Sequence, residues 1–247
     1  MIVNYQELLN QSVSGEILTK LQAIQIQNQL LPLADFENSI DFKHLSIIAG
    51  VDLAYWKQGT KEYGVCSIVL LDYKTRQIIE TCSDFGEISF PYIPGCLSFR
   101  EIPLILKTSK KLKLKPDLYL FDGNGYLHPR HMGIATHAGI YFNCPTIGVA
   151  KSYYKIWDTE YDMPKNTAGS YCDIQIGEEI YGRVLRTLPS VRPVFVSIGN
   201  KITLEDATQI TQYFITKESH IPLPTRLADI ETHKMRKHYQ EMFSDIK

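Results

Sequence analysis

The chain has 247 residues, of which 44% are hydrophobic and 21% charged, and its formal net charge is −1, values typical of a globular protein that is long enough to bury a core. It contains no run of eighteen apolar residues, and its N-terminus lacks a basic region followed by an apolar one, so we expect neither a membrane span nor a secretory signal. Because the net charge is close to zero, any polyanionic partner would have to be held by a local basic face. The five cysteines are odd in number and lack a Cys-x-x-Cys pair, so we expect neither a disulfide framework nor a zinc site. Reduced thiols are typical of the cytosol or nucleus, and we expect a cytoplasmic location.

The predicted elements begin with an N-terminal helical segment. Amphipathic spacing over the first thirty residues, interrupted near Gly15, predicts a helix within 1–40 that packs on the main body. Strands are predicted at 45–55, 63–72 and 76–82, the last two joined as a hairpin by the polar connection 72–75. The later elements are a helix around 102–112, a strand at 118–122, a helix at 130–142, a strand at 146–150, a hairpin around Gly177, a strand at 194–198 and a helix at 204–214.

This order of elements indicates the fold class. Antiparallel strands come first, and an alternation of strands and helices follows. Such an order predicts an α/β fold, a mixed sheet flanked by helices on its faces. We find no internal repeat, low-complexity tract or linker, so residues 1–247 are expected to form a single domain.

Residues 90–101 read FPYIPGCLSFRE and place an aromatic side chain between two prolines. Because proline restricts its own backbone and that of the residue before it, Pro91 and Pro94 make Tyr92 and Ile93 a stiff projection. A rigid, exposed tyrosine is suited to enter a stack of bases as a wedge. The alternative is a proline-braced loop whose tyrosine covers the core.

Three carboxylates fall at the ends of predicted elements. Asp52 lies near the end of the first strand, Asp122 at the end of the fourth, and Glu101 in the first turn of the helix between them. If these two strands are neighbours, the aspartates converge at one edge of the sheet, where like charges are costly unless a cation neutralises them. Oxygen ligands suit Mg²⁺, which activates water and stabilises charge on a phosphoryl group. The structural alternatives are a Ser98-x-x-Glu101 capping box and turn-forming roles for both aspartates.

Further polar residues follow the fourth strand. Residues 122–130 read DGNGYLHPR, in which the glycines allow close approach of backbone to a ligand. His128 and Arg130 are placed to contact a phosphate beside the metal, and His128 lacks a second His or Cys at zinc-ligand spacing. Lys151 closes the strand 146–150, where it either neutralises developing charge or is a solvated surface lysine.

Taken together, these motifs resemble the endonuclease V family of deoxyinosine 3′ endonucleases, which has a ribonuclease H-like fold. The similarity extends from about Asp41 to Arg226. Other ribonuclease H-like nucleases share the carboxylates but not the Pro-Tyr-Ile-Pro segment. The matching segments are 49–52 (AGVD), 90–95 (FPYIPG), 99–101 (FRE), 121–125 (FDGNG), 128–130 (HPR), 133–137 (GIATH), 145–151 (PTIGVAK) and 221–226 (IPLPTR).

The resemblance implies an enzyme that recognises inosine or deoxyinosine in nucleic acid. Such an enzyme hydrolyses the second phosphodiester bond 3′ to the lesion and leaves 3′-hydroxyl and 5′-phosphate ends. The implied partner is inosine-containing DNA or single-stranded RNA, between which the sequence does not distinguish. No membrane and no obligate protein partner are expected.

The resemblance also implies roles for individual residues. Asp52 and Asp122 would bind the catalytic Mg²⁺, with Glu101 completing the site directly or through water and Mn²⁺ acting as a substitute. Tyr92, between Pro91 and Pro94 and beside Ile93, would be the wedge. The walls of the hypoxanthine pocket would be Gly95, Leu97, Gly123 and Ile134. Lys151 would lie on the phosphate side, and His128 would lie in the active site.

One residue departs from the family pattern. In SIGNK, residues 197–201, Asn200 stands where most relatives have a histidine that lies close to the metal. Because asparagine carries no proton at neutral pH, the alternative function is an inosine-binding protein with weak or no cleavage. The intact carboxylates and Lys151 favour the nuclease. A nuclease for flaps or mismatches is a further alternative, and a small-molecule phosphatase would leave Tyr92 without a role.

Overall fold

Three long antiparallel strands form one side of the sheet. The computed structural model describes residues 7, 18–38 and 40–244. Strands β1 (Ile47–Gln58), β2 (Lys61–Asp72) and β3 (Ile78–Glu87) follow one another along the chain and pair as neighbours. The three strands overlap the predicted ranges, and the predicted hairpin between β2 and β3 is confirmed.

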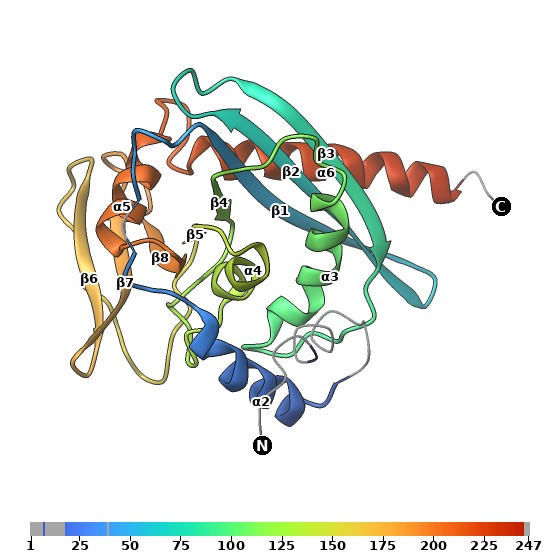
Figure 1. Ribbon diagram of the computed structural model, residues 1–247, viewed down its shortest axis with the longest axis horizontal. Coiled ribbons are helices and arrows are strands. Elements are labelled where there is room, and N and C mark those ends of the chain that lie inside the picture. The colour runs from blue at the N-terminus through green and yellow to red at the C-terminus, as the bar shows by residue number, and fades with distance from the viewer. Residues whose placement is uncertain (1–6, 8–17, 39, 245–247) are drawn as a thin grey trace.

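Two short parallel strands connect this part to the rest of the sheet. Strand β4 (Leu118–Phe121) pairs in parallel with β1, and β5 (Thr146–Ala150) pairs in parallel with β4. Antiparallel strands β8 (Val194–Asn200), β7 (Glu179–Arg186) and β6 (Ser170–Ile176) complete the order β3-β2-β1-β4-β5-β8-β7-β6 (Figure 1). The predicted ribonuclease H-like mixed sheet, in a single domain, is confirmed.

Helices cover both faces of the sheet (Figure 1). Helices α3 (Leu97–Ser109) and α4 (Ile134–Phe142) lie on one face. Helices α5 (Leu204–Tyr213) and α6 (Leu223–Ser244) lie on the other. Among the residues that the structure describes, no helix is both long and apolar enough to cross a membrane.

The alternation of side chains along the buried strands gives each face its own core. In β4, Leu118 and Leu120 pack with α5 and α6, whereas Tyr119 and Phe121 pack with α3 and α4. All four side chains are buried, as expected for a central strand covered on both faces. The four consecutive apolar residues of β4 therefore belong alternately to the hydrophobic cores on the two faces of the sheet.

The N-terminal segment packs beside the start of α3. Helix α2 (Lys20–Leu30) continues into the 3₁₀ turn η1 (Leu31–Leu33). Its side chains Ala23 and Ile26 are buried against Phe99 and its neighbours. Apart from residue 7, the part of the predicted helix before residue 18 lies outside the described residues.

Two helix predictions are corrected by the structure. The N-cap of α3 is Cys96, so Ser98 lies inside the helix, which excludes the alternative in which Ser98 and Glu101 form a capping box. For the same reason Glu101 lies in the second turn and not in the first. Helix α4 begins at Ile134, later than predicted, because the preceding residues form a turn in which His131 has a φ of 53°.

The long C-terminal helix α6 was not among the predicted elements, and its first turn crosses β1. A Cβ atom on Gly50 would lie 2.0 Å from the backbone oxygen of Pro224. The AGVD and IPLPTR motifs, far apart in the sequence, are therefore in direct contact. A glycine is required at this crossing because any side chain would overlap the backbone of α6.

Gly50→Ala should lower the free energy of unfolding by about 3 kcal/mol, since overpacking against backbone forces α6 away from β1. The matched control is Gly86→Ala in β3, where a Cβ would lie 3.7 Å from the nearest heavy atom, on Leu104. Its stability should change by less than about 1 kcal/mol. Urea unfolding followed by circular dichroism measures both, and equal stabilities of the two variants would contradict the described crossing.

Candidate active site

Acidic side chains gather beside the carboxyl end of β4. In the parallel pairing Val51 lies opposite Phe121, so the next residues along the two strands, Asp52 and Asp122, lie side by side. Helix α3 adds Glu101, which is buried and feels the charges of both aspartates. The structure thus brings together the three carboxylates that the sequence singled out, although Asp52 lies in the middle of β1 and not near the end of a strand as predicted, because β1 continues to Gln58 in its pairing with β2.

Burial makes ionisation of this cluster costly. It raises the pKa of Asp52 to about 7, and the negative charges of Asp122 and Asp229 add to the effect. Burial also raises the pKa of Glu101 to about 7, although a hydrogen bond from the Tyr55 hydroxyl acts in the opposite direction. A divalent cation would remove this repulsion. The oxygen donors and the uncompensated charge therefore fit a metal site.

A chain of contacts ties Glu101 to the loop before α3. The Tyr55 hydroxyl donates a hydrogen bond to Glu101, and the guanidinium of Arg100 lies 4.6 Å from the centre of the Tyr55 ring. Arg100 also forms an ion pair with Glu62 at 2.6 Å and donates to the carbonyl of Phe90 at 2.9 Å. Sequence reasoning missed the part played by Tyr55, because only the folded structure brings β1 against α3.

Lys151 supplies positive charge to the cluster. Its Nζ lies 2.6 Å from Asp122 and 3.4 Å from Asp229. Burial by itself would lower the pKa of Lys151, but these ion pairs raise it. The ammonium group is therefore charged at neutral pH and belongs to the site, which excludes the isolated surface lysine considered above.

Asp229 is the carboxylate that sequence reasoning missed. It lies on α6, and its charge contributes to the raised pKa of Asp52. The matching motif that precedes it ends at Arg226, three residues earlier. The Asp229-x-x-x-His233 spacing, which places both side chains on one face of a helix, was the available signal.

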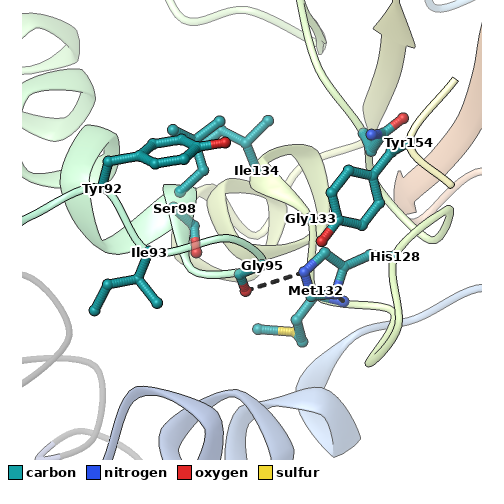
Figure 2. Close-up of a pocket in the computed structure, with 11 residues that line it drawn as sticks. Tyr92, Ile93, Gly95, Ser98, His128, Met132, Gly133, Ile134 and Tyr154 are labelled. Carbon is teal, nitrogen blue, oxygen red and sulfur yellow. Dashed lines mark hydrogen bonds between the residues drawn. The ribbon is translucent and has the colours of Figure 1, made fainter. Parts of the chain in front are cut away.

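A pocket lies next to the carboxylates, between the loop before α3, the loop after β4 and the start of α4 (Figure 2). Its empty volume is about 520 Å³ when the open solvent at its mouth is included. The sequence singled out six of its lining residues, and the others are new. Those expected are Tyr92, Ile93, Gly95, Leu97, His128 and Ile134; those added are Ser98, Asn124, Met132, Gly133 and Tyr154.

Three residues of the expected set do not line this pocket. Pro91 and Pro94 flank the tyrosine segment in the sequence. Gly123 lies behind the pocket wall, where a Cβ would approach the Ile134 side chain to 2.7 Å. It follows Asp122 directly, so the pocket wall and the carboxylate cluster are joined by one peptide bond.

The carbonyl oxygen of Gly95 holds the pocket loop in place. It accepts hydrogen bonds from His128 at 3.1 Å, Arg130 at 2.7 Å and Gln27 of α2 at 3.0 Å. The φ of Gly95 is +76°, and a Cβ here would lie 2.9 Å from the Arg130 guanidinium. Glycine is therefore required both by the backbone conformation and by the three converging donors.

His128 is a neutral, structural member of this pocket. Its Nδ1 accepts backbone hydrogen bonds from Arg130 and Met132, so Nε2 carries the proton that is donated to Gly95. Burial, with a further contribution from Arg130, lowers the pKa of His128 to about 3. The ring stacks parallel to Tyr154. His128 and Arg130 thus both donate hydrogen bonds to the Gly95 carbonyl. These hydrogen bonds hold the loop and do not bear on the predicted contact with a phosphate.

Tyr92 projects from the pocket rim. Its side chain is 72% exposed, which excludes the alternative in which it covers the core. Figure 2 shows Tyr92 and Tyr154 on opposite sides of the pocket. The loop that carries Tyr92 is fixed at Gly95 by the three donors and at Phe90 by Arg100.

Asn200 has a structural role away from the carboxylates. It pairs with Thr146 at the start of β5, whereas the carboxylates lie beyond the opposite ends of β4 and β5. The Asn200 amide donates to the carbonyls of Gly139 and Cys144 and accepts from the backbone of Asp35. The expectation that this position lies close to the metal is wrong. The binding-only alternative, which depended on Asn200, loses its basis.

A sheet of this order that gathers buried carboxylates beside a pocket is typical of a nuclease of ribonuclease H-like fold. Comparison with known proteins narrows the class. The family model described as Endonuclease V matches residues 29–230. An endonuclease V of Bacillus thuringiensis subsp. konkukian is 55% identical over 217 residues, which are 88% of this chain and 92% of the relative.

Solved structures agree with this match. The crystal structure of endonuclease V from Bacillus subtilis is 46% identical, with a TM-score of 0.89 over 92% of this chain and 96% of that one. A Ciona intestinalis endonuclease V, in complex with a 24mer DNA containing an inosine followed by a ribo-adenosine, is 29% identical, with a TM-score of 0.76 over 89% and 98%. The chain belongs to the endonuclease V family and is an endonuclease.

Proposed function

We propose that the chain is a Mg²⁺-dependent endonuclease that recognises inosine or deoxyinosine and hydrolyses the second phosphodiester bond 3′ to it. The products would carry 3′-hydroxyl and 5′-phosphate ends, in DNA repair or in the processing of inosine-containing RNA. Membership of the family supports the reaction. The complex of the Ciona relative with inosine-containing DNA supports the substrate class.

The observation that carries this proposal is that the same two segments build the pocket and the carboxylate cluster. In α3, Leu97 and Ser98 line the pocket and Glu101 reaches the cluster one turn later. After β4, Asp122 belongs to the cluster and Gly123 supports the pocket wall. A base held in the pocket would therefore place its own 3′ side at a fixed offset from the carboxylates. This arrangement supports the proposed cleavage at a set distance from the lesion.

The catalytic roles follow from charge and position. Asp52, Asp122 and Glu101 would hold Mg²⁺, with Mn²⁺ as a substitute, and Asp229 adds a further carboxylate. A divalent cation supplies charge stabilisation at the phosphate and lowers the pKa of water. Lys151, paired with Asp122, places a fixed positive charge where phosphate oxygens gain negative charge.

The pocket residues have recognition roles in this proposal. Tyr92, braced by Pro91 and Pro94, fills the space left by a base that rotates out of its stack. Ile93, Gly95, Leu97, Gly123 and Ile134 form or support the pocket walls. Because the pKa of His128 is lowered to about 3, His128 is a positioning residue that holds the Gly95 carbonyl and not a proton donor to the substrate at neutral pH.

Residues 1–247 would act as one catalytic unit, with the helical segment 1–40 packed on it. The hydrogen bond from Gln27 to Gly95 supports this, since α2 thereby helps to shape the pocket. A cytoplasmic location is supported by the five cysteines, all of which are free thiols.

The proposal predicts cleavage of single-stranded DNA and RNA oligonucleotides that each contain one inosine. With Mg²⁺, the end-labelled product should map to the second phosphodiester bond 3′ to inosine, and EDTA should abolish it. Asp52→Ala and Asp122→Ala should each lower the rate by a factor of about 10³ or more, since several kcal/mol of charge stabilisation are lost.

The controls are a matched oligonucleotide with adenosine in place of inosine and the variant Asp173→Asn. Asp173 lies on β6, at the far edge of the sheet, where it pairs with Arg183. This variant should cleave at the wild-type rate. Equal cutting of the adenosine oligonucleotide, or full activity of either alanine variant, would contradict the proposed function.

Tyr92→Ala should reduce cleavage of double-stranded inosine DNA by about 10- to 100-fold and affect a single strand much less, because only the duplex must be unstacked and unpaired. Tyr92→Phe should remain active, since a wedge requires the ring and not the hydroxyl. Tyr171→Ala, at another exposed tyrosine on β6, is the matched control. An equal loss on both substrates would show that Tyr92 is not a wedge.

A further inference from the structure

His137 is a buried histidine that the proposed cleavage does not use. It lies on α4, at the end of the GIATH motif, and its side chain is fully buried. Its Nδ1 lies 2.8 Å from Oγ of Ser98 in α3, which lines the pocket (Figure 2). The other ring nitrogen, Nε2, is buried and has no hydrogen-bond partner among the described residues. The pair therefore joins the pocket wall to a polar group whose second nitrogen is unpaired.

The surroundings of His137 hold its ring in place and keep it neutral. The ring stacks on Tyr141 with the centroids 5.7 Å apart, and it lies edge to face with Phe99 at 5.2 Å. Burial lowers the pKa of His137 to about 3. At neutral pH the ring therefore carries a single proton, which lies either on Nδ1 or on Nε2.

The position of this proton decides what Ser98 offers to the pocket. With the proton on Nε2, the ring has a buried N–H without an acceptor, and the Ser98 hydroxyl donates its own proton to Nδ1. With the proton on Nδ1, this nitrogen donates to Ser98 Oγ, and only a lone pair of Nε2 is unpaired. Orphaned buried N–H groups are rarer in proteins than unsatisfied acceptors. The second arrangement leaves the hydroxyl proton of Ser98 free for a bound base.

A free hydroxyl proton at this place distinguishes two purines. Ser98 is 1% exposed, so bulk water reaches little of it and a base in the pocket would supply the acceptor. Hypoxanthine has a carbonyl oxygen, O6, where adenine has an amino group that donates. An amino group facing Ser98 would leave the hydroxyl proton without an acceptor, and an unpaired buried donor costs more than a typical hydrogen bond gains. A site built in this way rejects the base that lacks the acceptor.

We propose that Ser98, with His137 as its positioning residue, donates a hydrogen bond to O6 of hypoxanthine and thereby selects inosine over adenosine. This assignment rests on the proposed recognition of inosine in this pocket, and it adds a side chain that reads the base. Binding is measured in EDTA, without cleavage, so a failure to cut inosine strands and a failure of the Ser98 contact are separate results.

The first test is the affinity of the full chain for single-stranded DNA oligonucleotides, measured by fluorescence anisotropy in EDTA. The strands carry one inosine, one adenosine or one nebularine, a purine nucleoside with hydrogen in place of O6. Ser98→Ala should weaken binding of the inosine strand by about 3- to 10-fold, which is the effect of one neutral hydrogen bond. It should change the affinity for the nebularine strand by less than about 2-fold, because that base offers no O6.

Ser83→Ala is the matched control. Ser83 lies on β3, and its hydroxyl is hydrogen-bonded to Ser67 at 2.8 Å. Ser83 is not among the residues that line the pocket. The variant therefore also removes a hydroxyl from a paired side chain, and it should bind all three strands as the wild type does.

Variants of His137 test the positioning role. His137→Asn keeps an N–H donor near the place of Nδ1 and should bind the inosine strand within about 2-fold of the wild type. His137→Leu removes the donor and should weaken binding as much as Ser98→Ala does. The double variant should lose no more than either single variant, because both changes break the same contact. Thermal unfolding checks that each variant is folded.

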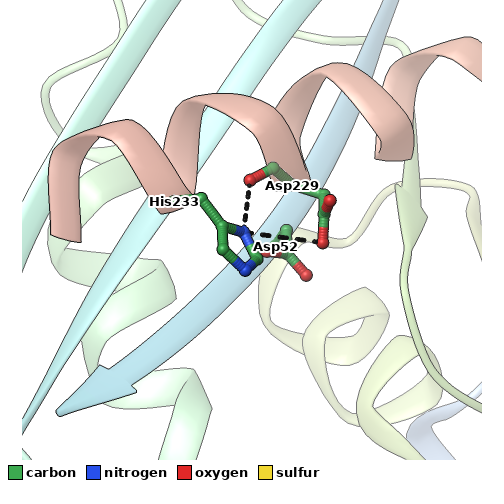
Figure 3. A group of neighbouring side chains, drawn as sticks. All are labelled: Asp52, Asp229 and His233. Atoms are coloured by element: carbon green, nitrogen blue, oxygen red, sulfur yellow. Dashed lines mark hydrogen bonds and ion pairs between the residues drawn. The ribbon is translucent and has the colours of Figure 1, made fainter. Parts of the chain in front are cut away.

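Two-bond ¹H–¹⁵N spectra of the wild type with the inosine strand report the proton position directly, whichever variants fold. His128 is the internal reference for a proton on Nε2, because its Nδ1 accepts from backbone N–H groups. His233 is the reference for a proton on Nδ1, because this atom lies 2.9 Å from the carbonyl oxygen of Asp229, which only accepts (Figure 3). His137 should show the pattern of His233.

Three results would each overturn the proposal. The first is a proton on Nε2 of His137 in the complex. The second is a Ser98→Ala variant that binds the inosine strand as tightly as the wild type. The third is an equal loss of affinity for the inosine and nebularine strands, since the hydroxyl would then act without O6.

Discussion

The parallel pairing of β1 with β4 is the interaction on which the site depends. It sets Asp52 beside Asp122 at a place that α3 and α6 cover from the two faces of the sheet, so water screens the two charges poorly. Burial raises the pKa of Asp52 and Glu101 to about 7, and Lys151 balances only part of the negative charge. The fold therefore carries electrostatic repulsion that a divalent cation would relieve, and such repulsion is a common stability cost of functional sites.

A second constraint fixes the recognition loop. The Gly95 carbonyl accepts hydrogen bonds from Gln27, His128 and Arg130, which come from two distant parts of the chain. Arg100 holds the other end of the same loop and reaches Glu101 through the Tyr55 ring. A loop ordered in this way loses little conformational entropy when it meets a base. The Tyr92 loop, the pocket and the carboxylates are therefore joined by one set of contacts.

Much of this site could be predicted from the sequence because its signals are local. Asp122 directly follows the apolar strand β4, as predicted, whereas Asp52 lies in the middle of β1, and the parallel register of the two strands sets the aspartates side by side. Asp229 was missed because its contact with the other carboxylates depends on α6 crossing β1 at Gly50, a tertiary arrangement that the local spacing of Asp229 and His233 does not reveal. The inference about Asn200 was wrong because it rested on the resemblance, whereas the antiparallel pairing of β8 sends this residue to the start of β5.

The most direct test of this account is the thermal stability of metal-free protein at pH 8. Folding raises the pKa of Asp52 from its ordinary value of 3.8 to about 7, so ionisation of Asp52 at pH 8 destabilises the metal-free fold, and Asp52→Asn removes this cost. In EDTA the variant should melt about 2–4 °C above the wild type for each kcal/mol regained, and Mg²⁺ should stabilise the wild type much more than the variant. A variant that is less stable than the wild type in EDTA, or equal stabilisation of both by Mg²⁺, would contradict the charge balance described here.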